Sequence, residues 1–151
     1  MPAVFYHVHR ITSDDVDVLG HANNLAYLQW MQTAALAHSA AQGWPGERYR
    51  EIGYGWVVRA HQIEYRQPAF PDQEIIVKTW VADMQKATSL RRYHILRLAG
   101  DREILLAEAS TNWAFIHYAS GMPKRIPTEV SAAFVAVPDV PATDRAAINP
   151  V

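Results

Sequence analysis

No charged residue occurs between Ala22 and Gly46, a stretch long enough for a helix of several turns. Asn23 or Asn24 can cap the start of such a helix, and Gly43 and Pro45 end it. Apolar residues follow at helical spacing: Leu25, Leu28, Met31, Ala35 and Leu36. A surface helix has a charged face and this one has none, while its Gln, Thr, Ser and His side chains are too polar for a membrane span. The sequence therefore predicts a helix enclosed by protein on nearly all its faces.

The remainder of the chain is rich in strand-forming residues. Val, Ile, Thr and aromatic side chains are frequent in five segments, which we predict to be strands: 3–9, 56–66, 74–82, 89–98 and 103–118. Short turns separate the last three of these strands, which favours antiparallel pairing. A short helix is expected over 127–134. One buried helix and one long, curved antiparallel sheet wrapped around it predict an α+β domain.

Composition limits the domain count and the partners. The chain has 151 residues, and we expect one domain over 1–136 and a loosely ordered, Pro- and Ala-rich tail over 137–151. The formal net charge is −1, so the chain has no overall positive potential that would attract nucleic acid. Cysteine is absent, which excludes disulfides and thiolate nucleophiles. Because neither a signal peptide nor an apolar run of membrane length is found, we expect a cytoplasmic protein with no membrane partner.

The loop before the predicted helix carries the residues best suited to catalysis. Free backbone N–H groups near Asn24 would lie at the helix start, where they can hold an oxygen that becomes negative during attack on a carbonyl. Gly20 allows close approach of the backbone to a substrate. The Asp17 carboxylate can attack such a carbonyl or deprotonate a water. The pattern indicates acyl transfer, although an Asp-rich capped turn has the same residue types.

The same loop resembles a known signature. Its string is similar to that of hotdog-fold acyl-CoA thioesterases of the hydroxybenzoyl-CoA thioesterase type: Asp17-x-x-Gly20-His21-x-Asn23-Asn24-x-x-Tyr27-Leu28. Segments 63–72 and 113–127 resemble later parts of that family in the same order. The resemblance implies a hotdog fold, hydrolysis of an acyl-CoA to acid and CoA, and no cofactor, because CoA enters with the substrate. It also implies a homodimer or homotetramer with the active site at the subunit interface.

The resemblance assigns roles to particular residues. Asp17 takes the place of the catalytic aspartate, as nucleophile or base, and a backbone N–H at Asn24 or a neighbour takes the place of the oxyanion donor. His21, after Gly20, either orients the thioester or water or serves in packing. Asn23 and Tyr27 are expected to contact substrate. Five basic residues are candidates for the CoA phosphates or, equally, for keeping strand ends soluble: Lys86, Arg91, Arg92, Lys124 and Arg125.

The helix also departs from the pattern. Many relatives carry an acidic residue and an Arg on this helix, whereas this chain has Gln32 or Thr33 in place of the acid and Ala35 in place of the Arg. A mechanism that depends on a Glu of the helix is therefore not available to this chain. Two alternatives therefore stay open. One is a hotdog enoyl-CoA hydratase or dehydratase that uses Asp17 and His21, and the other is a non-catalytic acyl-CoA-binding domain. No metal is expected, because two strand histidines alone, His7-x-His9, do not make a site.

Overall fold

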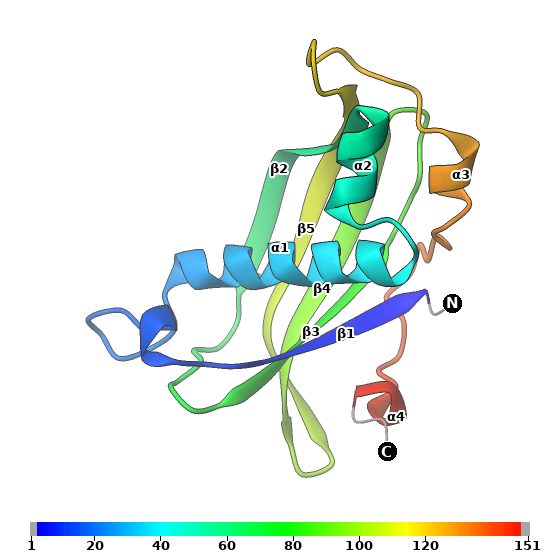
Figure 1. Cartoon of the computed structure of the whole chain (residues 1–151). Coiled ribbons are helices and arrows are strands. Elements are labelled where there is room, and N and C mark those ends of the chain that lie inside the picture. Colours follow the sequence, from blue (N-terminus) through cyan, green and yellow to red (C-terminus); the bar gives the residue numbers. More distant parts are fainter. Residues whose placement is uncertain (1–2, 149–151) are drawn as a thin grey trace.

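The computed structural model describes residues 3–148, in which one long helix lies across the concave face of an antiparallel sheet (Figure 1). The five strands are β1 (Val4–Arg10), β2 (Tyr54–Tyr65), β3 (Glu74–Val81), β4 (Thr88–Ala99) and β5 (Arg102–His117). The helices are η1 (Ser13–Asp15), α1 (Asn24–Ala41), α2 (Gly46–Ile52), α3 (Thr128–Ser131) and α4 (Arg145–Ile148). The expected α+β class and the five expected strands are confirmed.

The sheet order is β1-β3-β4-β5-β2, and all neighbouring pairs are antiparallel. Strands β3, β4 and β5 follow one another through short turns, as the sequence predicted. Strand β2 pairs with β5 at one edge, and β1 pairs with β3 at the other. Strand β3, between β1 and β4, is buried on both faces, which explains why its sequence reads as a nearly continuous apolar run.

Helix α1 starts and ends where the uncharged stretch predicted. Asn23 is the N-cap, and its side chain accepts a hydrogen bond from the Leu25 N–H. The face toward the sheet is buried and consists of Ala26, Tyr27, Trp30, Met31, Ala34, Ala35 and His38. The opposite face is open, with Leu25 71% and Leu36 60% exposed. The expectation of a helix enclosed on nearly all faces is therefore wrong for a single chain, because the sheet curves around only one side of it.

The sequence did not predict α2, which packs beside the end of α1. The helix begins after Pro45 with Glu47 in its first turn, and it ends at Gly53 in the left-handed conformation (φ 80°). Pro at a helix start and Gly at its end are recognisable signals. We assigned Pro45 only to the end of α1, and this hid the second helix. None of the helices in residues 3–148 is long and apolar enough to cross a membrane.

The part of the tail within the described residues lies along the convex face of the sheet. Lys78 on β3 donates to Pro141 O and to Thr143 Oγ1, the latter at 3.1 Å. The Tyr6 hydroxyl accepts a hydrogen bond from Asp144 N–H at 2.8 Å. Ile148 is buried with Ile76 and Leu96. Residues 137–148 thus make specific contacts that their composition did not indicate, while 149–151 lie outside the described residues.

Candidate active site

The loop that precedes α1 is closed by backbone hydrogen bonds. A bridge pairs Val16 with Ala22, and the Asp17 N–H donates to His21 O at 3.0 Å. The Gly20 N–H donates a hydrogen bond to Asp17 O at 3.1 Å. Gly20 has φ 86°, a backbone conformation that glycine adopts more readily than residues with a side chain. The loop therefore leads the chain out from Asp17 and back to the start of the helix within five residues.

The Asp17 carboxylate is half-buried at the base of this loop. Its Oδ1 accepts a hydrogen bond from the Leu19 N–H at 2.9 Å, so the side chain is oriented by the turn that follows it. Val18 and Leu19 at the tip of the loop are among the most exposed apolar side chains of the described chain. These two side chains place apolar surface beside the oriented carboxylate.

The amides at the start of α1 are not equivalent. The Asn23 N–H donates to Asp15 O at 2.6 Å, and the Leu25 N–H donates to Asn23 Oδ1 at 2.9 Å. Asn24 lies between them as the first helical residue, and no carbonyl of the helix can accept its N–H. Tyr65 OH donates to Asn24 O at 2.9 Å and so holds this residue from the other side. Of the three candidate N–H groups, that of Asn24 is therefore the best placed to donate a hydrogen bond to an oxygen of a bound ligand.

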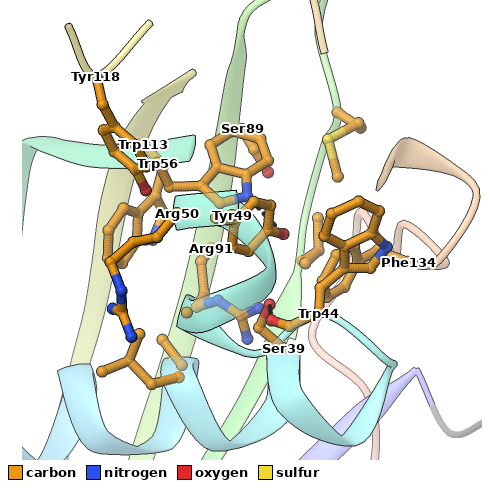
Figure 2. A pocket seen from close by; sticks show the side chains of 15 residues that line it. Ser39, Trp44, Tyr49, Arg50, Trp56, Ser89, Arg91, Trp113, Tyr118 and Phe134 are labelled. Carbon is orange, nitrogen blue, oxygen red and sulfur yellow. Dashed lines mark hydrogen bonds between the residues drawn. The ribbon is translucent and has the colours of Figure 1, made fainter. Parts of the chain in front are cut away.

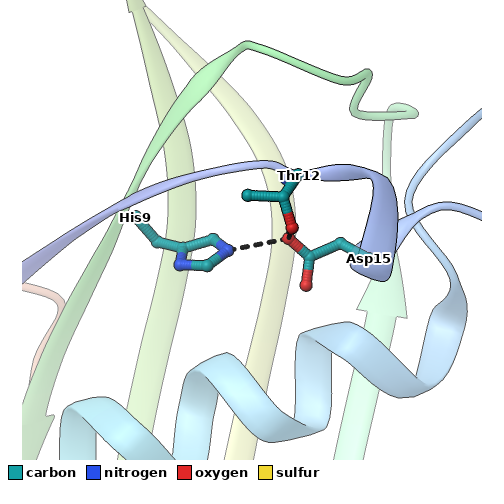
Figure 3. A network of polar contacts seen from close by, with 3 residues as sticks. All are labelled: His9, Thr12 and Asp15. Atoms are coloured by element: carbon teal, nitrogen blue, oxygen red, sulfur yellow. Dashed lines mark hydrogen bonds and ion pairs between the residues drawn. The ribbon is translucent and has the colours of Figure 1, made fainter.

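A second carboxylate, which the sequence analysis did not single out, lies next to this loop (Figure 3). Asp15 Oδ2 accepts hydrogen bonds from His9 Nε2 and from the Thr12 N–H, each at 2.9 Å. Burial raises the pKa of Asp15, but the hydrogen bonds from Thr12 and His9 outweigh it, and the pKa lies below its usual value. Thr12 three residues before Asp15 is a capping-box spacing that predicts this contact.

Two other predicted site residues face protein. The His21 ring meets Phe70 edge-on at 5.7 Å between centroids, which supports the packing alternative for this histidine. Tyr27 is 2% exposed, and its ring contacts Trp30 and Tyr65. Tyr27 thus belongs to the core between α1 and the sheet and steadies the helix start. No group of three metal-ligating side chains is found in residues 3–148.

The five basic residues predicted to bind CoA phosphates lie in different parts of the structure. The Ile126 N–H donates to Lys86 O at 2.8 Å, which brings Lys86 next to the segment that carries Lys124 and Arg125. Arg92 is on the convex face, 5.6 Å from the ring of Trp80. Arg91, its neighbour on β4, points to the opposite face and is buried under α1. Only the group of Lys86, Lys124 and Arg125 is therefore brought together.

A cavity of the described chain lies away from Asp17. It has a volume of about 220 Å³ and opens between α2, the sheet and the second half of α1 (Figure 2). From Asn24 to Ser39, which lines this cavity, α1 rises roughly 22 Å. Within one chain, the cavity and the Asp17 loop are thus at opposite ends of the helix.

Comparison with known proteins identifies the family. The pattern of the thioesterase-like superfamily matches residues 11–134, which include the Asp17 loop, α1 and the strands β2 to β5. None of the curated protein sequences compared with the chain matches it.

Solved structures share the fold at low sequence identity. A hypothetical protein from Aquifex aeolicus has 22% identity and a TM-score of 0.79, with 87% of this chain and 99% of that chain covered. A 1,4-dihydroxy-2-naphthoyl-CoA thioesterase from Synechocystis has 17% identity and a TM-score of 0.78, with 86% and 94% covered. A mutant 4-hydroxybenzoyl-CoA thioesterase in complex with 4-hydroxybenzoyl-CoA has 16% identity and a TM-score of 0.80, with 89% and 100% covered. With its hotdog fold and this match over most of its length, the chain belongs to the thioesterase-like superfamily.

Proposed function

We propose that this protein hydrolyses an acyl-CoA thioester to a free acid and CoA. Membership of the thioesterase-like superfamily supports the reaction class. Two of the structural neighbours are named as thioesterases of aromatic acyl-CoAs, which supports CoA as the carrier. The single observation that carries the proposal is the meeting of an oriented carboxylate, Asp17, with the start of α1 in one closed loop.

Asn24 is the proposed oxyanion donor. A thioester carbonyl becomes negative at oxygen when a nucleophile adds to its carbon, and a pre-oriented amide at a helix start stabilises that charge. The neighbouring N–H groups of Asn23 and Leu25 are occupied by Asp15 O and Asn23 Oδ1. This leaves Asn24, whose position is held by the hydrogen bond from Tyr65 OH to its carbonyl.

Asp17 is the proposed reactive carboxylate, by either of two routes. As a base it removes a proton from a water whose oxygen adds to the carbonyl carbon. As a nucleophile it adds to that carbon itself, and water then cleaves the resulting anhydride. In both routes the C–S bond breaks, the sulfur leaves as CoA thiolate and takes up a proton, and the acid is released. The hydrogen bond from the Leu19 N–H to Oδ1 fixes the orientation of the carboxylate that both routes use.

The group of Lys86, Lys124 and Arg125 is the proposed site for CoA phosphates. In Figure 1 the turn between β3 and β4 and the chain after β5 lie at the upper end of the sheet, away from the Asp17 loop at the start of α1. A CoA held by this group would therefore reach the Asp17 loop of a second subunit more readily than that of its own.

A second copy of the chain is the proposed partner. The open face of α1 exposes Leu25 and Leu36, the Asp17 loop exposes Val18 and Leu19, and β2 is a long edge strand with an exposed second half. Exposed apolar surface and an unpaired strand edge are both covered when two copies associate. The homodimer or homotetramer implied by the family resemblance thus has a physical basis in this chain.

Hydrolysis is tested by incubating the purified protein with a panel of acyl-CoAs and measuring free thiol. Saturated acyl-CoAs, aromatic acyl-CoAs and crotonyl-CoA belong in the panel. Release of thiol from saturated or aromatic members supports hydrolysis. Hydration of crotonyl-CoA without release of thiol would instead support a hydratase, and binding without any turnover would support an acyl-CoA-binding domain.

A further inference from the structure

The cavity beneath α2 contains a buried cation and no acid. Its lining consists of Ala35, Leu36, Ser39, Trp44, Gly46, Tyr49, Arg50, Trp56, Val81, Met84, Ser89, Arg91, Trp113, Tyr118 and Phe134. We propose that this cavity binds a small aromatic or branched carboxylate, with the carboxylate on Arg91 and the apolar part among the surrounding aromatic rings. The site is separate from the Asp17 loop, and the proposal does not require that loop to be catalytic.

Arg91 is held in place by neutral groups alone. It is 5% exposed, and its Nη1 donates to His38 Nδ1 at 2.9 Å and to Thr79 Oγ1 at 3.1 Å. Because the guanidinium has donors only, His38 must present a lone pair at Nδ1. The Thr79 hydroxyl donates onward to Arg92 O at 3.0 Å. These contacts orient the guanidinium but contribute no negative charge.

A buried cation without a counter-ion is costly, which favours an anionic ligand. No Asp or Glu of residues 3–148 forms an ion pair with Arg91, and the second cation of the cavity, Arg50, lies toward solvent. Burial lowers the pKa of Arg91, yet a guanidinium stays protonated in proteins. A carboxylate entering the cavity would meet a positive, partly desolvated fork of N–H donors, the arrangement that binds carboxylates best.

The rest of the lining selects the apolar part of the ligand. Trp44 and Tyr49 stack at 5.0 Å between ring centroids, and Trp56 donates from Nε1 to the Tyr49 hydroxyl at 3.1 Å (Figure 2). That hydroxyl also has a hydrogen bond with the Ser39 side chain, whose Oγ donates to Trp44 O at 2.6 Å. An apolar cavity of about 150 Å³ is sufficient for benzene. The larger volume here, about 220 Å³, suits one ring or a short branched chain plus a carboxylate, rather than a long fatty chain.

Two sources can supply such a carboxylate. It is either a free acid, or the far end of an acyl group whose other carboxyl is a thioester at the Asp17 loop of a second subunit, which rests on the proposed function. Both place the same chemistry on Arg91, and they differ in whether the occupant of the cavity is also being hydrolysed. The experiment therefore has a binding arm, which needs no turnover, and a turnover arm.

The binding arm compares acids with their neutral amides on the unmodified protein by isothermal titration calorimetry. The probes are benzoate, phenylacetate and 3-phenylpropanoate, each beside its amide. At least one acid is expected to bind about tenfold or more tightly than its amide, since a charge-assisted contact is lost in the amide. Equal binding of acid and amide, or no binding by any acid, would overturn the proposal.

Variants locate the contact. Arg91→Met is expected to remove the preference for acid over amide, and Arg91→Lys is expected to keep part of it. Arg92→Met on the opposite face of the same strand is the matched control and is expected to keep it in full. Thermal unfolding of each variant shows whether it is folded, and the comparison on the unmodified protein decides the question if Arg91→Met is not. A preference that survives in folded Arg91→Met would contradict the assignment.

The turnover arm separates the two sources. Glutaryl-CoA carries a terminal carboxylate, and pentanoyl-CoA is its neutral counterpart. If the acyl group occupies the cavity, glutaryl-CoA is hydrolysed with the higher kcat/KM and Arg91→Met removes that preference. If a free acid is the ligand, the two thioesters are hydrolysed alike while the acids still bind. Should no thioester be hydrolysed, the proposed function fails, whereas the binding arm still supports or overturns the carboxylate site.

Discussion

The Asn23 side chain accepts a hydrogen bond from the Leu25 N–H at 2.9 Å, and this contact has two consequences for the helix start. It satisfies one of the amides that the first turn of α1 leaves without an acceptor. It also removes that amide from competition for a substrate oxygen, so the Asn24 N–H stands alone between two occupied neighbours. Stability and the proposed chemistry therefore depend on the same cap.

Replacement of this cap should destabilise the protein. Asn23→Ala is expected to lower the free energy of unfolding by about 1 kcal/mol, the usual cost of removing an N-cap side chain. Urea unfolding followed by circular dichroism measures the change. Gln29→Ala on the exposed face of α1 is the matched control and should change stability by less than about 0.5 kcal/mol. Equal effects of the two substitutions would show that the Asn23 contact does not stabilise the helix.

The pair of His9 and Asp15 predicts a particular dependence of stability on pH. The pKa of Asp15 is lower in the folded chain than its unperturbed value of 3.8, so its contribution is fully present above about pH 4 and is lost as the pH falls through the folded pKa. Asp15→Asn should therefore lose about 1–2 kcal/mol at pH 7, because a charged hydrogen-bond acceptor is removed. The difference from the unmodified protein should shrink in unfolding measurements below pH 4. A difference that grows with acidity would contradict this assignment.

The contacts of the tail predict that it stabilises the domain. Ile148 is buried against Ile76 and Leu96 on the convex face of the sheet, whereas Val140 in the same tail is exposed. Ile148→Ala should lower the free energy of unfolding by about 2 kcal/mol, at the low end for a buried Ile. Val140→Ala, measured in the same thermal or urea unfolding experiment, should have little effect. If both substitutions were neutral, the tail would not contribute to the stability of the sheet.

The open face of α1 predicts the assembly state. Leu36→Glu places a charge on that face and should shift the protein from an oligomer to a monomer in sedimentation velocity experiments. Val135→Glu alters another exposed apolar residue, outside α1, and should leave the oligomer intact. A protein that is already monomeric without substitution would contradict the proposed second copy.

The sequence predicted elements whose signals are local. The uncharged stretch marked α1, and the Asn23 cap follows from side-chain chemistry next to it. Helix α2 was missed because Pro45 was interpreted only as a stop, although Gly53 signals the end of a second helix. The cation within the cavity was also missed. Arg91 and Arg92 look alike in sequence, and only the alternation of side chains along β4, combined with α1 above one face, buries the first and leaves the second outside.

The proposed site also combines features with a local sequence signal and features that depend on the fold. Asp17 and the helix start are adjacent in sequence, so their closeness was predictable, and the structure adds the hydrogen bonds that distinguish Asn24 from its neighbours. The pairing of Asp15 with His9 joins a loop to the strand before it, and the spacing of Thr12 and Asp15 was its only local signal. The proposed contact between the open face of α1 and a second copy has no local signal in the sequence beyond the missing charges.

The most direct test of the central claim is the rate of thiol release by Asp17→Asn from the best acyl-CoA of the panel. Because Asn cannot act as a base or form the anhydride, kcat should fall by about 100-fold or more while the protein stays folded. Asp14→Asn, a change to an exposed carboxylate of the same segment, should leave kcat within about twofold. An Asp17→Asn protein that released thiol at the rate of the unmodified enzyme would contradict the assignment of Asp17 as the reactive carboxylate.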